Sequence, residues 1–202
     1  MRYPPDHKAK AREALLEAGA RSLKTCGFNG IGVDGLAAAA GVTSGAFYSN
    51  FPSKEAMLEA VIDAGLGEPF MSDTDSATLA EGRAHLISYV HDYISADHST
   101  DAAEGCLVPA LSADVSRAQP PVQDAYARKM TAVVDRIAGL LDGEASDRQR
   151  RAWSLVALMV GSIVISRGIP EQSESRTAQL DSARSTASAL IDADDGAHPT
   201  SD

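Results

Sequence analysis

The sequence predicts an all-α protein of about nine helices, because apolar residues recur at three- and four-residue spacing along most of the chain. No segment keeps the alternation of apolar and polar residues that marks a half-buried strand for more than a few positions. Hydrophobic residues make up 44% of the 202 residues, which is typical of a globular protein. We therefore expect helices that pack around a hydrophobic core.

Residues 1–65 are predicted to form an N-terminal helical domain. Gly27 is placed to end a long first helix with a left-handed residue, and Gly41 is placed to form a tight turn between two short helices. Pro52 ends the second short helix, and Ser53 caps the helix that follows it. The expected helices run from about Asp6 to Thr25, Val33 to Ala40, Thr43 to Phe51 and Ser53 to Gly65.

Residues 66–192 are predicted to form a larger helical body. Gly65, Gly67 and Pro69 interrupt the helical pattern, so we place the boundary between the two domains near Gly65–Asp75. Residues 193–202 form an acidic tail that we expect to be disordered. The expected body helices lie at about Leu79–Ser95, Gly105–Arg117, Pro121–Leu141, Asp147–Ser166 and Ser173–Ile191.

The formal net charge of −10 is unevenly distributed between the two predicted domains. Residues 1–65 contain seven Lys or Arg and seven Asp or Glu, whereas the remainder contains 11 and 21. An N-terminal domain of balanced charge with cations near its start can still bind phosphates. The absence of a secretory or membrane-spanning segment predicts a soluble, cytoplasmic protein. Cys26 and Cys106 have neither the spacing of a zinc site nor that of a disulfide scaffold.

The segment Gly27–Glu55 has the residue pattern of a helix-turn-helix. Ala37 and Ala40 are small enough for a second helix to cross closely, and Gly41 permits the positive φ angle of the turn. Thr43 is predicted to cap the second helix through its hydroxyl group. The turn and cap together predict that a recognition helix follows.

The predicted recognition helix has an apolar side and a polar side. Phe47 and Phe51, four positions apart, are expected to face the core, which leaves Tyr48 and Ser49 facing outward. Thr43, Ser44 and Gly45 form a slim polar first turn that can approach bases and phosphates. Lys8 and Lys10 on the first helix, and Lys54 after the recognition helix, are predicted to meet the DNA backbone.

The stretch Gly30–Leu58 closely resembles the TetR family of bacterial regulators, whose signature resembles GxTTVxxIAxxAGVSxGxFYxHFxSKExL. Gly32 departs from this pattern where the family usually has a Thr or Ser cap, and Gly35 lies within a helix. Ser44 and Ser49 stand where relatives often carry Arg or Lys. The resemblance implies DNA contacts from Thr43, Ser44, Gly45, Tyr48, Ser49 and Lys54.

The family resemblance also implies that the body binds a small-molecule effector and forms a homodimer through its last two helices, about Asp147–Ile191. Residues 152–165 are apolar nearly all round, which fits a dimer interface or, alternatively, a central helix of a monomer. Seven residues are candidates to line the effector site, although each also suits an ordinary core: His85, Tyr89, Tyr93, Cys106, Tyr126, Met130 and Trp153. No metal site or cofactor is expected, and His91 and His98 are expected to be solvated.

The favoured function is a repressor that binds a palindromic double-stranded DNA operator and is released by a small-molecule effector. Its mechanism would use the helix Ser53–Gly65 to separate two recognition helices that lie about 34–36 Å apart on DNA. One alternative is a helical adaptor that has lost DNA binding. Another is a thiol-based electrophile sensor through Cys106, which equally suits a small core residue. The sequence has no Gly-rich phosphate loop or nucleophile elbow, so an enzyme is not expected.

Overall fold

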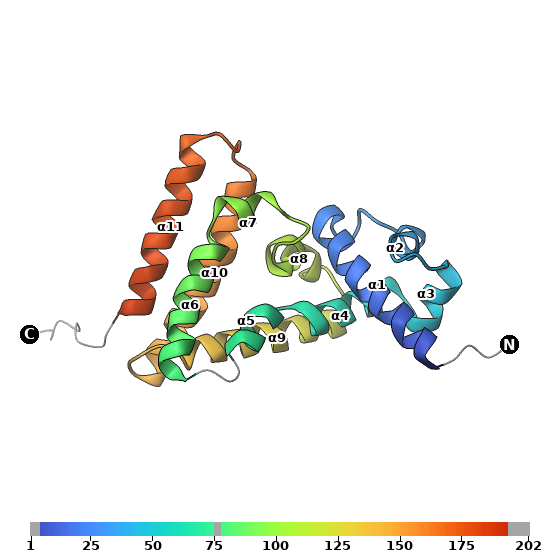
Figure 1. Ribbon diagram of the computed structural model, residues 1–202, viewed down its shortest axis with the longest axis horizontal. Coiled ribbons are helices and arrows are strands. Elements are labelled where there is room, and N and C mark those ends of the chain that lie inside the picture. Colours follow the sequence, from blue (N-terminus) through green and yellow to red (C-terminus); the bar gives the residue numbers. More distant parts are fainter. Residues whose placement is uncertain (1–4, 75–77, 194–202) are drawn as a thin grey trace, which may run out of the picture. The chain divides into compact units, whose positions relative to one another are not determined.

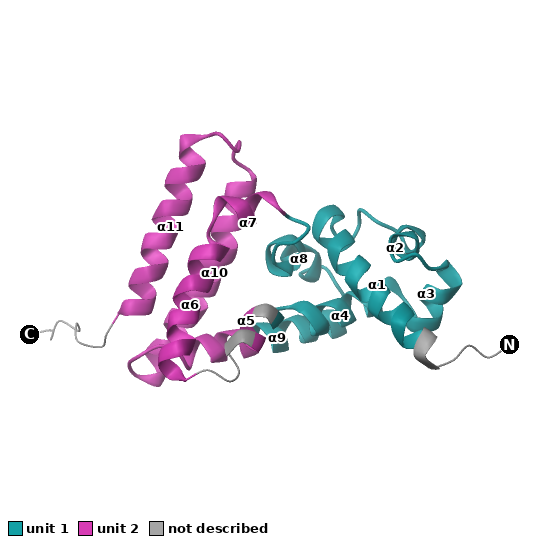
Figure 2. Ribbon diagram, in the orientation of Figure 1, with its two compact units in different colours: residues 1–68, 102–130 teal, residues 69–101, 131–202 magenta. Residues whose placement is uncertain are grey.

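The computed structural model describes residues 5–74 and 78–193, and across these residues all regular secondary structure is helical (Figure 1). The all-α prediction is therefore confirmed. The chain divides into two compact units (Figure 2). The first contains residues 1–68 and 102–130, and the second contains residues 69–101 and 131–202. The predicted tail, apart from Ala193, lies outside the described residues.

The first unit is built on α1 (Pro5–Cys26), which packs against α2 (Val33–Ala39), α3 (Ser44–Asn50), α4 (Lys54–Gly65) and α8 (Leu107–Val115). α9 (Pro120–Ala138) begins in this unit. Its core contains Leu15 and Leu23 of α1, Phe47 of α3 and Met57 of α4. Burial of such side chains is the main stabilising term, at roughly 1.5–3 kcal/mol each.

Gly27 ends α1 as predicted, with a φ angle of 70°. Its N–H group donates a hydrogen bond of 2.9 Å to the carbonyl oxygen of Leu23 and so satisfies one of the free carbonyl groups at the end of the helix. A side chain at position 27 would also meet a carboxylate, because its Cβ atom would lie 3.3 Å from Oδ2 of Asp114 on α8. Glycine therefore permits both the turn and the close approach of α8.

The second unit contains most of α5 (Glu68–Thr74), together with α6 (Leu79–Tyr93), α7 (Ala96–Thr100), α10 (Ala145–Arg167) and α11 (Glu174–Asp192). α10 and α11 lie side by side along most of their length (Figure 1). Leu155 and Ile163 of α10 and Leu180 and Ala187 of α11 are all buried. The two helices predicted last in the chain therefore form one packed pair.

Two short helices, α5 and α7, were not predicted. The segment Gly65–Asp75 was expected to be a break, but α5 forms there because Phe70, which is only 1% exposed, anchors it to the core. No element was predicted between the expected helices Leu79–Ser95 and Gly105–Arg117, but α7 forms there, and Ser95 caps it by accepting a hydrogen bond of 3.2 Å from the N–H group of His98. With these additions the described residues form eleven helices rather than about nine.

The compact units do not follow the predicted division at residue 65, since residues 102–130 group with the N-terminal helices. Sequence order did not indicate this, because three helices, α5, α6 and α7, separate α4 from α8 along the chain, and yet α8 packs against α1. The predicted domains, 1–65 and 66–192, remain a prediction. The unit that presents the helix-turn-helix also contains α8.

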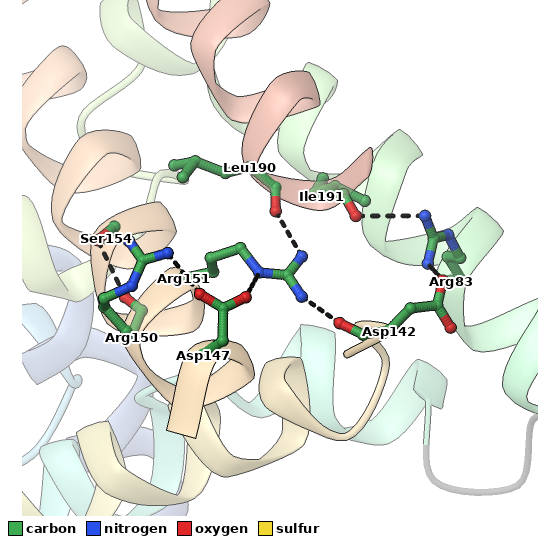
Figure 3. A network of polar contacts seen from close by, with 8 residues as sticks. All are labelled: Arg83, Asp142, Asp147, Arg150, Arg151, Ser154, Leu190 and Ile191. Carbon is green, nitrogen blue, oxygen red and sulfur yellow. Dashed lines mark hydrogen bonds and ion pairs between the residues drawn. The ribbon is translucent and has the colours of Figure 1, made fainter. Parts of the chain in front are cut away.

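A buried arginine joins the start of α10 to the end of α11 (Figure 3). Arg151 on α10 is only 1% exposed, and its Nε atom donates to a carboxylate oxygen of Asp147 at 2.6 Å. Its other nitrogens donate to the carbonyl oxygens of Leu190 at 3.0 Å and of Asp142. Arg83 of α6 contacts the same region through the carbonyl of Ile191. One guanidinium group thus joins α10, the end of α11 and the loop before α10.

Candidate DNA-binding and effector sites

The turn between α2 and α3 has the geometry that a helix-turn-helix requires. Gly41 has a φ angle of 67°, and the N–H group of Val42 donates to the carbonyl oxygen of Ala37 at 2.9 Å. Thr43 caps α3 by accepting a hydrogen bond of 3.1 Å from the N–H group of Ala46. The predicted turn and cap are therefore confirmed, and α3 takes the position of the recognition helix.

The two sides of α3 differ as predicted. Phe47 is fully buried and Phe51, just after the helix, is 2% exposed, whereas Tyr48 is 57% exposed. Gly45 and Ser49 are also exposed, and Ser44 is half-buried. The hydroxyl of Ser49 donates to the carbonyl of Gly45 at 2.8 Å, and that of Ser44 donates to Asp34. Apart from Tyr48, the outward side chains of α3 are thus short, and none of them is a Lys or Arg.

Cations from α1 lie near this surface within the first unit. The guanidinium group of Arg12 stands 4.5 Å above the ring of Phe51 and donates to the carbonyl of Asn50 at 3.4 Å. Lys8, about one turn before Arg12, and Lys10, two residues before it, are both exposed. Positive charge is therefore present on α1 beside the end of the recognition helix.

Lys54 makes contacts that the sequence did not reveal. Its Nζ atom donates to the carbonyl oxygens of Phe28 and of Ile31, the latter at 2.9 Å, and lies 4.0 Å from the centre of the Phe28 ring. The side chain is half-buried. A contact between Lys54 and DNA remains a prediction. In the free protein its ammonium group holds the loop before α2.

The two glycine departures from the family pattern have different structural contexts. Gly32 is the N-cap residue of α2 and provides no side-chain hydrogen bond there. Gly35 lies inside α2, where a Cβ atom would be only 2.8 Å from Cγ1 of Ile31. The loop before α2 therefore packs directly onto the helix at Gly35, and a larger residue would displace Ile31.

The predicted effector residues on α6 form one aromatic row in the second unit. The ring of Phe70 lies 5.9 Å from that of His85 and 5.0 Å from that of Tyr89. Tyr89 lies 5.9 Å from Tyr93, whose ring in turn meets His98 edge-on at 4.3 Å. Because the three α6 residues are four positions apart, they share one face of the helix. His98, expected to be solvated, is a half-buried part of this row.

The remaining effector candidates belong to other helices. Tyr126 and Met130 are on α9 in the first unit, where the hydroxyl groups of Tyr126 and Ser112 are 2.9 Å apart. Burial raises the pKa of Tyr126, the hydrogen bond between Tyr126 and Ser112 opposes this, and the electrostatic interaction with Cys106 raises it further. Met130 is buried, whereas Trp153 on α10 is 44% exposed. Three of the seven candidates, Cys106, Tyr126 and Met130, belong to the first unit, and the other four belong to the second.

Cys106 lies at the start of α8 as predicted. It is the N-cap residue of that helix, and its sulfur accepts a hydrogen bond of 3.4 Å from the N–H group of Val108. The side chain is partly accessible.

Among the described residues, none of the helices combines the length and apolar character needed to cross a bilayer. Within residues 5–74 and 78–193, no group of three or more His, Cys, Asp or Glu side chains is arranged to hold a metal ion.

The fold and the α2–α3 geometry define a helix-turn-helix protein of the DNA-binding class. Residues 15–61 match the family described as "Bacterial regulatory proteins, tetR family". The N-terminal helix-turn-helix segment of the chain therefore belongs to the TetR family.

Named relatives are transcriptional repressors. The chain is 31% identical over 112 residues to the HTH-type transcriptional repressor DhaR of Mycobacterium sp. (strain GP1), and the match covers 54% of each protein. It is 27% identical over 133 residues to the HTH-type transcriptional repressor NemR of Escherichia coli (strain K12), a match that covers 65% of this chain and 67% of NemR. The chain thus spans about half the length of DhaR.

Solved structures share the fold over nearly the full chain. The structure of E. coli NemR in its reduced form superimposes with a TM-score of 0.72 at 23% identity and covers 95% of this chain and 99% of that one. A TetR-family regulator from Cytophaga hutchinsonii gives a TM-score of 0.74 at 20% identity, with coverage of 94% and 96%. At these identities the likeness establishes the fold alone.

Proposed function

We propose that this protein is a homodimeric repressor that binds a palindromic double-stranded DNA operator and is released from it by a small-molecule effector. The observation that carries the proposal is the exposed polar side of α3, directly after a capped turn and opposite the buried Phe47. Its relatives DhaR and NemR, both named as transcriptional repressors, support this role, and they also support a function other than catalysis. Cytoplasmic location follows from a function on DNA.

The proposed DNA contacts come from α3 and from the start of α1. Tyr48 and the first turn of α3 would enter the major groove, where short side chains and free N–H groups reach bases and phosphates. Lys8 and Lys10 would bind phosphates. Because few long cations are present, we expect a shallow dependence of affinity on salt. The contact residues of α3 are Thr43, Ser44, Gly45, Tyr48 and Ser49.

The proposed dimer interface is the outer side of α10 together with α11. Trp153, Val164 and Ile165 are 44%, 50% and 56% exposed although all three are large and apolar. A Cβ atom at Gly161 would meet no neighbour within 4 Å, so that part of α10 is uncovered in the single chain. Pairing with a second copy would remove this apolar surface from water. Trp153 is then better explained as an interface residue than as part of an effector site.

The proposed effector site uses the aromatic row of Phe70, His85, Tyr89 and Tyr93. Aromatic rings with polar atoms at their edges suit a flat, mostly apolar molecule that accepts or donates a few hydrogen bonds. Replacing Tyr89 by Ala should then weaken release of DNA by such a molecule without weakening DNA binding itself.

The first experiment selects DNA from a pool of random duplexes at several salt concentrations. Recovery of a palindrome whose half-sites lie about one helical turn apart supports the proposal. If a folded, dimeric protein enriches no sequence above non-specific binding, the proposal fails and the adaptor function gains support. Tyr48→Ala, which removes an exposed side chain of α3, should abolish enrichment while leaving the thermal stability nearly unchanged.

A second candidate function, sensing of electrophiles or oxidants, is favoured by the contact between the Cys106 sulfur and the N–H group of Val108. The name of the NemR structure refers to a reduced form of that relative. Treatment with hypochlorite or a quinone should then release DNA from the wild type but not from Cys106→Ser. Cys26→Ser is the matched control, because Cys26 is exposed and should not affect release. Equal release from both variants would remove this candidate.

A further inference from the structure

The loop between α1 and α2 is held from two sides at one peptide. The N–H group of Phe28 donates a hydrogen bond of 2.9 Å to Oδ2 of Asp114 on α8. The carbonyl oxygen of the same residue accepts from Nζ of Lys54, the first residue of α4. We call these two hydrogen bonds the Phe28 bridge. It joins α8 to the start of α4 within the first unit.

Further contacts hold the side chains of Asp114 and Lys54 in place. The Asp114 side chain is only 13% exposed, and its second oxygen pairs with Arg117 at 3.1 Å, so the carboxylate has a fixed orientation. Gly27 lets the carboxylate approach, because a Cβ atom there would lie 3.3 Å from Oδ2. Lys54 also donates a hydrogen bond to the carbonyl oxygen of Ile31, and its ammonium group lies over the Phe28 ring. Hydrogen bonds with one charged partner are among the stronger ones in proteins.

The loop that the bridge holds lies directly before the helix-turn-helix. Lys54 contacts both ends of the segment from Phe28 to Ile31, and Ile31 packs against Gly35 inside α2. Lys54 itself begins the helix that follows α3. The two ends of the helix-turn-helix are therefore joined through one ammonium group.

We propose that Asp114 and Lys54 are positioning residues that orient the recognition helix through the Phe28 bridge, and that the bridge links α8 to the DNA-binding surface. Lys54 then acts on DNA binding through the loop rather than by contacting phosphate. Movement of α8 changes the placement of α2 and α3, a coupling that is added to that expected through α4. This inference rests on the proposed function for its effect on DNA, whereas the bridge itself can be tested without DNA.

The first test measures hydrogen exchange of the free protein. Asp114→Leu removes the acceptor, so exchange of the Phe28 amide should rise about tenfold or more. Asp114→Asn keeps an oxygen acceptor and should retain much of the protection. Arg117→Met is the matched control, because it removes only the exposed partner of Asp114. Unchanged exchange in Asp114→Leu would overturn the bridge whether or not the protein binds DNA.

The second test compares salt dependence of binding to the selected DNA. The plot of log K against log salt has a negative slope. Each lost phosphate contact makes this slope less steep by about 0.9, or by about 1.8 for a dimer. Lys54→Met should lower affinity while leaving this slope unchanged, whereas Lys8→Met, which removes a proposed phosphate contact, should reduce the slope. A reduced slope for Lys54→Met overturns the positioning role and assigns the residue to phosphate. Failure of the wild type to bind any DNA would count against the proposed function, while the exchange test would still decide the bridge.

Discussion

Arg151 provides the sharpest test of how the second unit is held together. The variant Arg151→Met keeps an apolar side chain of similar length and removes the guanidinium group. In the wild type this group is 1% exposed and donates to Asp147, to the carbonyl of Leu190 and to the carbonyl of Asp142. The substitution therefore leaves two carbonyl groups and a carboxylate without their shared donor (Figure 3).

The expected loss of stability follows from the burial of these partners. Removing one member of a buried ion pair costs about 3–5 kcal/mol. The carboxylate keeps a second arginine, and Asp142 lies on the surface, where water can reach its carbonyl. We therefore expect the lower end of that range, about 3 kcal/mol, for the Arg151 variant. For a protein of this size the melting temperature should fall by about 6–12 °C.

Thermal unfolding followed by circular dichroism measures the effect, and Arg150→Met is the matched control. Arg150 donates to the same carboxylate but is 66% exposed, so its loss should lower the melting temperature by less than about 2 °C. Equal shifts in the two variants would refute the reasoning from burial. An unchanged melting temperature in Arg151→Met would show that water or other donors replace the guanidinium group at these carbonyl groups without loss of stability.

Three other perturbations have defined outcomes. Hydrogen bonds from Arg150 and then Arg151 hold the pKa of Asp147 below its ordinary value of 3.8. The wild type should therefore melt above Asp147→Asn at neutral pH and lose that advantage as the pH falls below 3.8; a difference independent of pH contradicts this. Gly27→Ala should cost about 1–2 kcal/mol in urea unfolding because of its positive φ angle, whereas Gly32→Ala, with open space around it, should cost little. Val164→Glu should convert the proposed dimer into a monomer in light scattering, and Ala113→Glu, an exposed change on α8, should not; an unchanged dimer in Val164→Glu contradicts the proposed interface.

The helix-turn-helix was predictable because its determinants are local. The positive φ of Gly41, the cap at Thr43 and the burial of Phe47 each depend on residues within a few positions. The end of α1 at Gly27 is of the same kind. Periodicity likewise located the longer helices to within a few residues of their ends.

The partners of charged side chains were not predictable. Lys54 fits a phosphate contact by its place in the sequence, but its ammonium group binds carbonyls more than twenty positions away. Asp114 was not singled out, although an acid within the apolar helix α8 was a signal that it has a partner. Arg151 was not singled out either, because its three partners come from separate parts of the chain.

The effector candidates divide in the same way. His85, Tyr89 and Tyr93 share a helix face through their spacing alone, and the structure joins them in one row. Cys106, Tyr126 and Met130 belong to the other unit, and Trp153 lies on an exposed surface. Aromatic or polar character shows that a residue suits a binding site, but only packing determines whether two such residues meet.

The sequence by itself determined the all-α fold, the helix-turn-helix and the family, because helix periodicity, caps and turns depend on neighbouring residues. Only the tertiary structure decided that α8 packs against α1, that Asp114 and Lys54 hold the Phe28 peptide, and that Arg151 is buried. These contacts join residues far apart in the chain, and side chains of one type can bind DNA, a carbonyl or water equally well. Their role is set by what the fold brings within hydrogen-bonding distance.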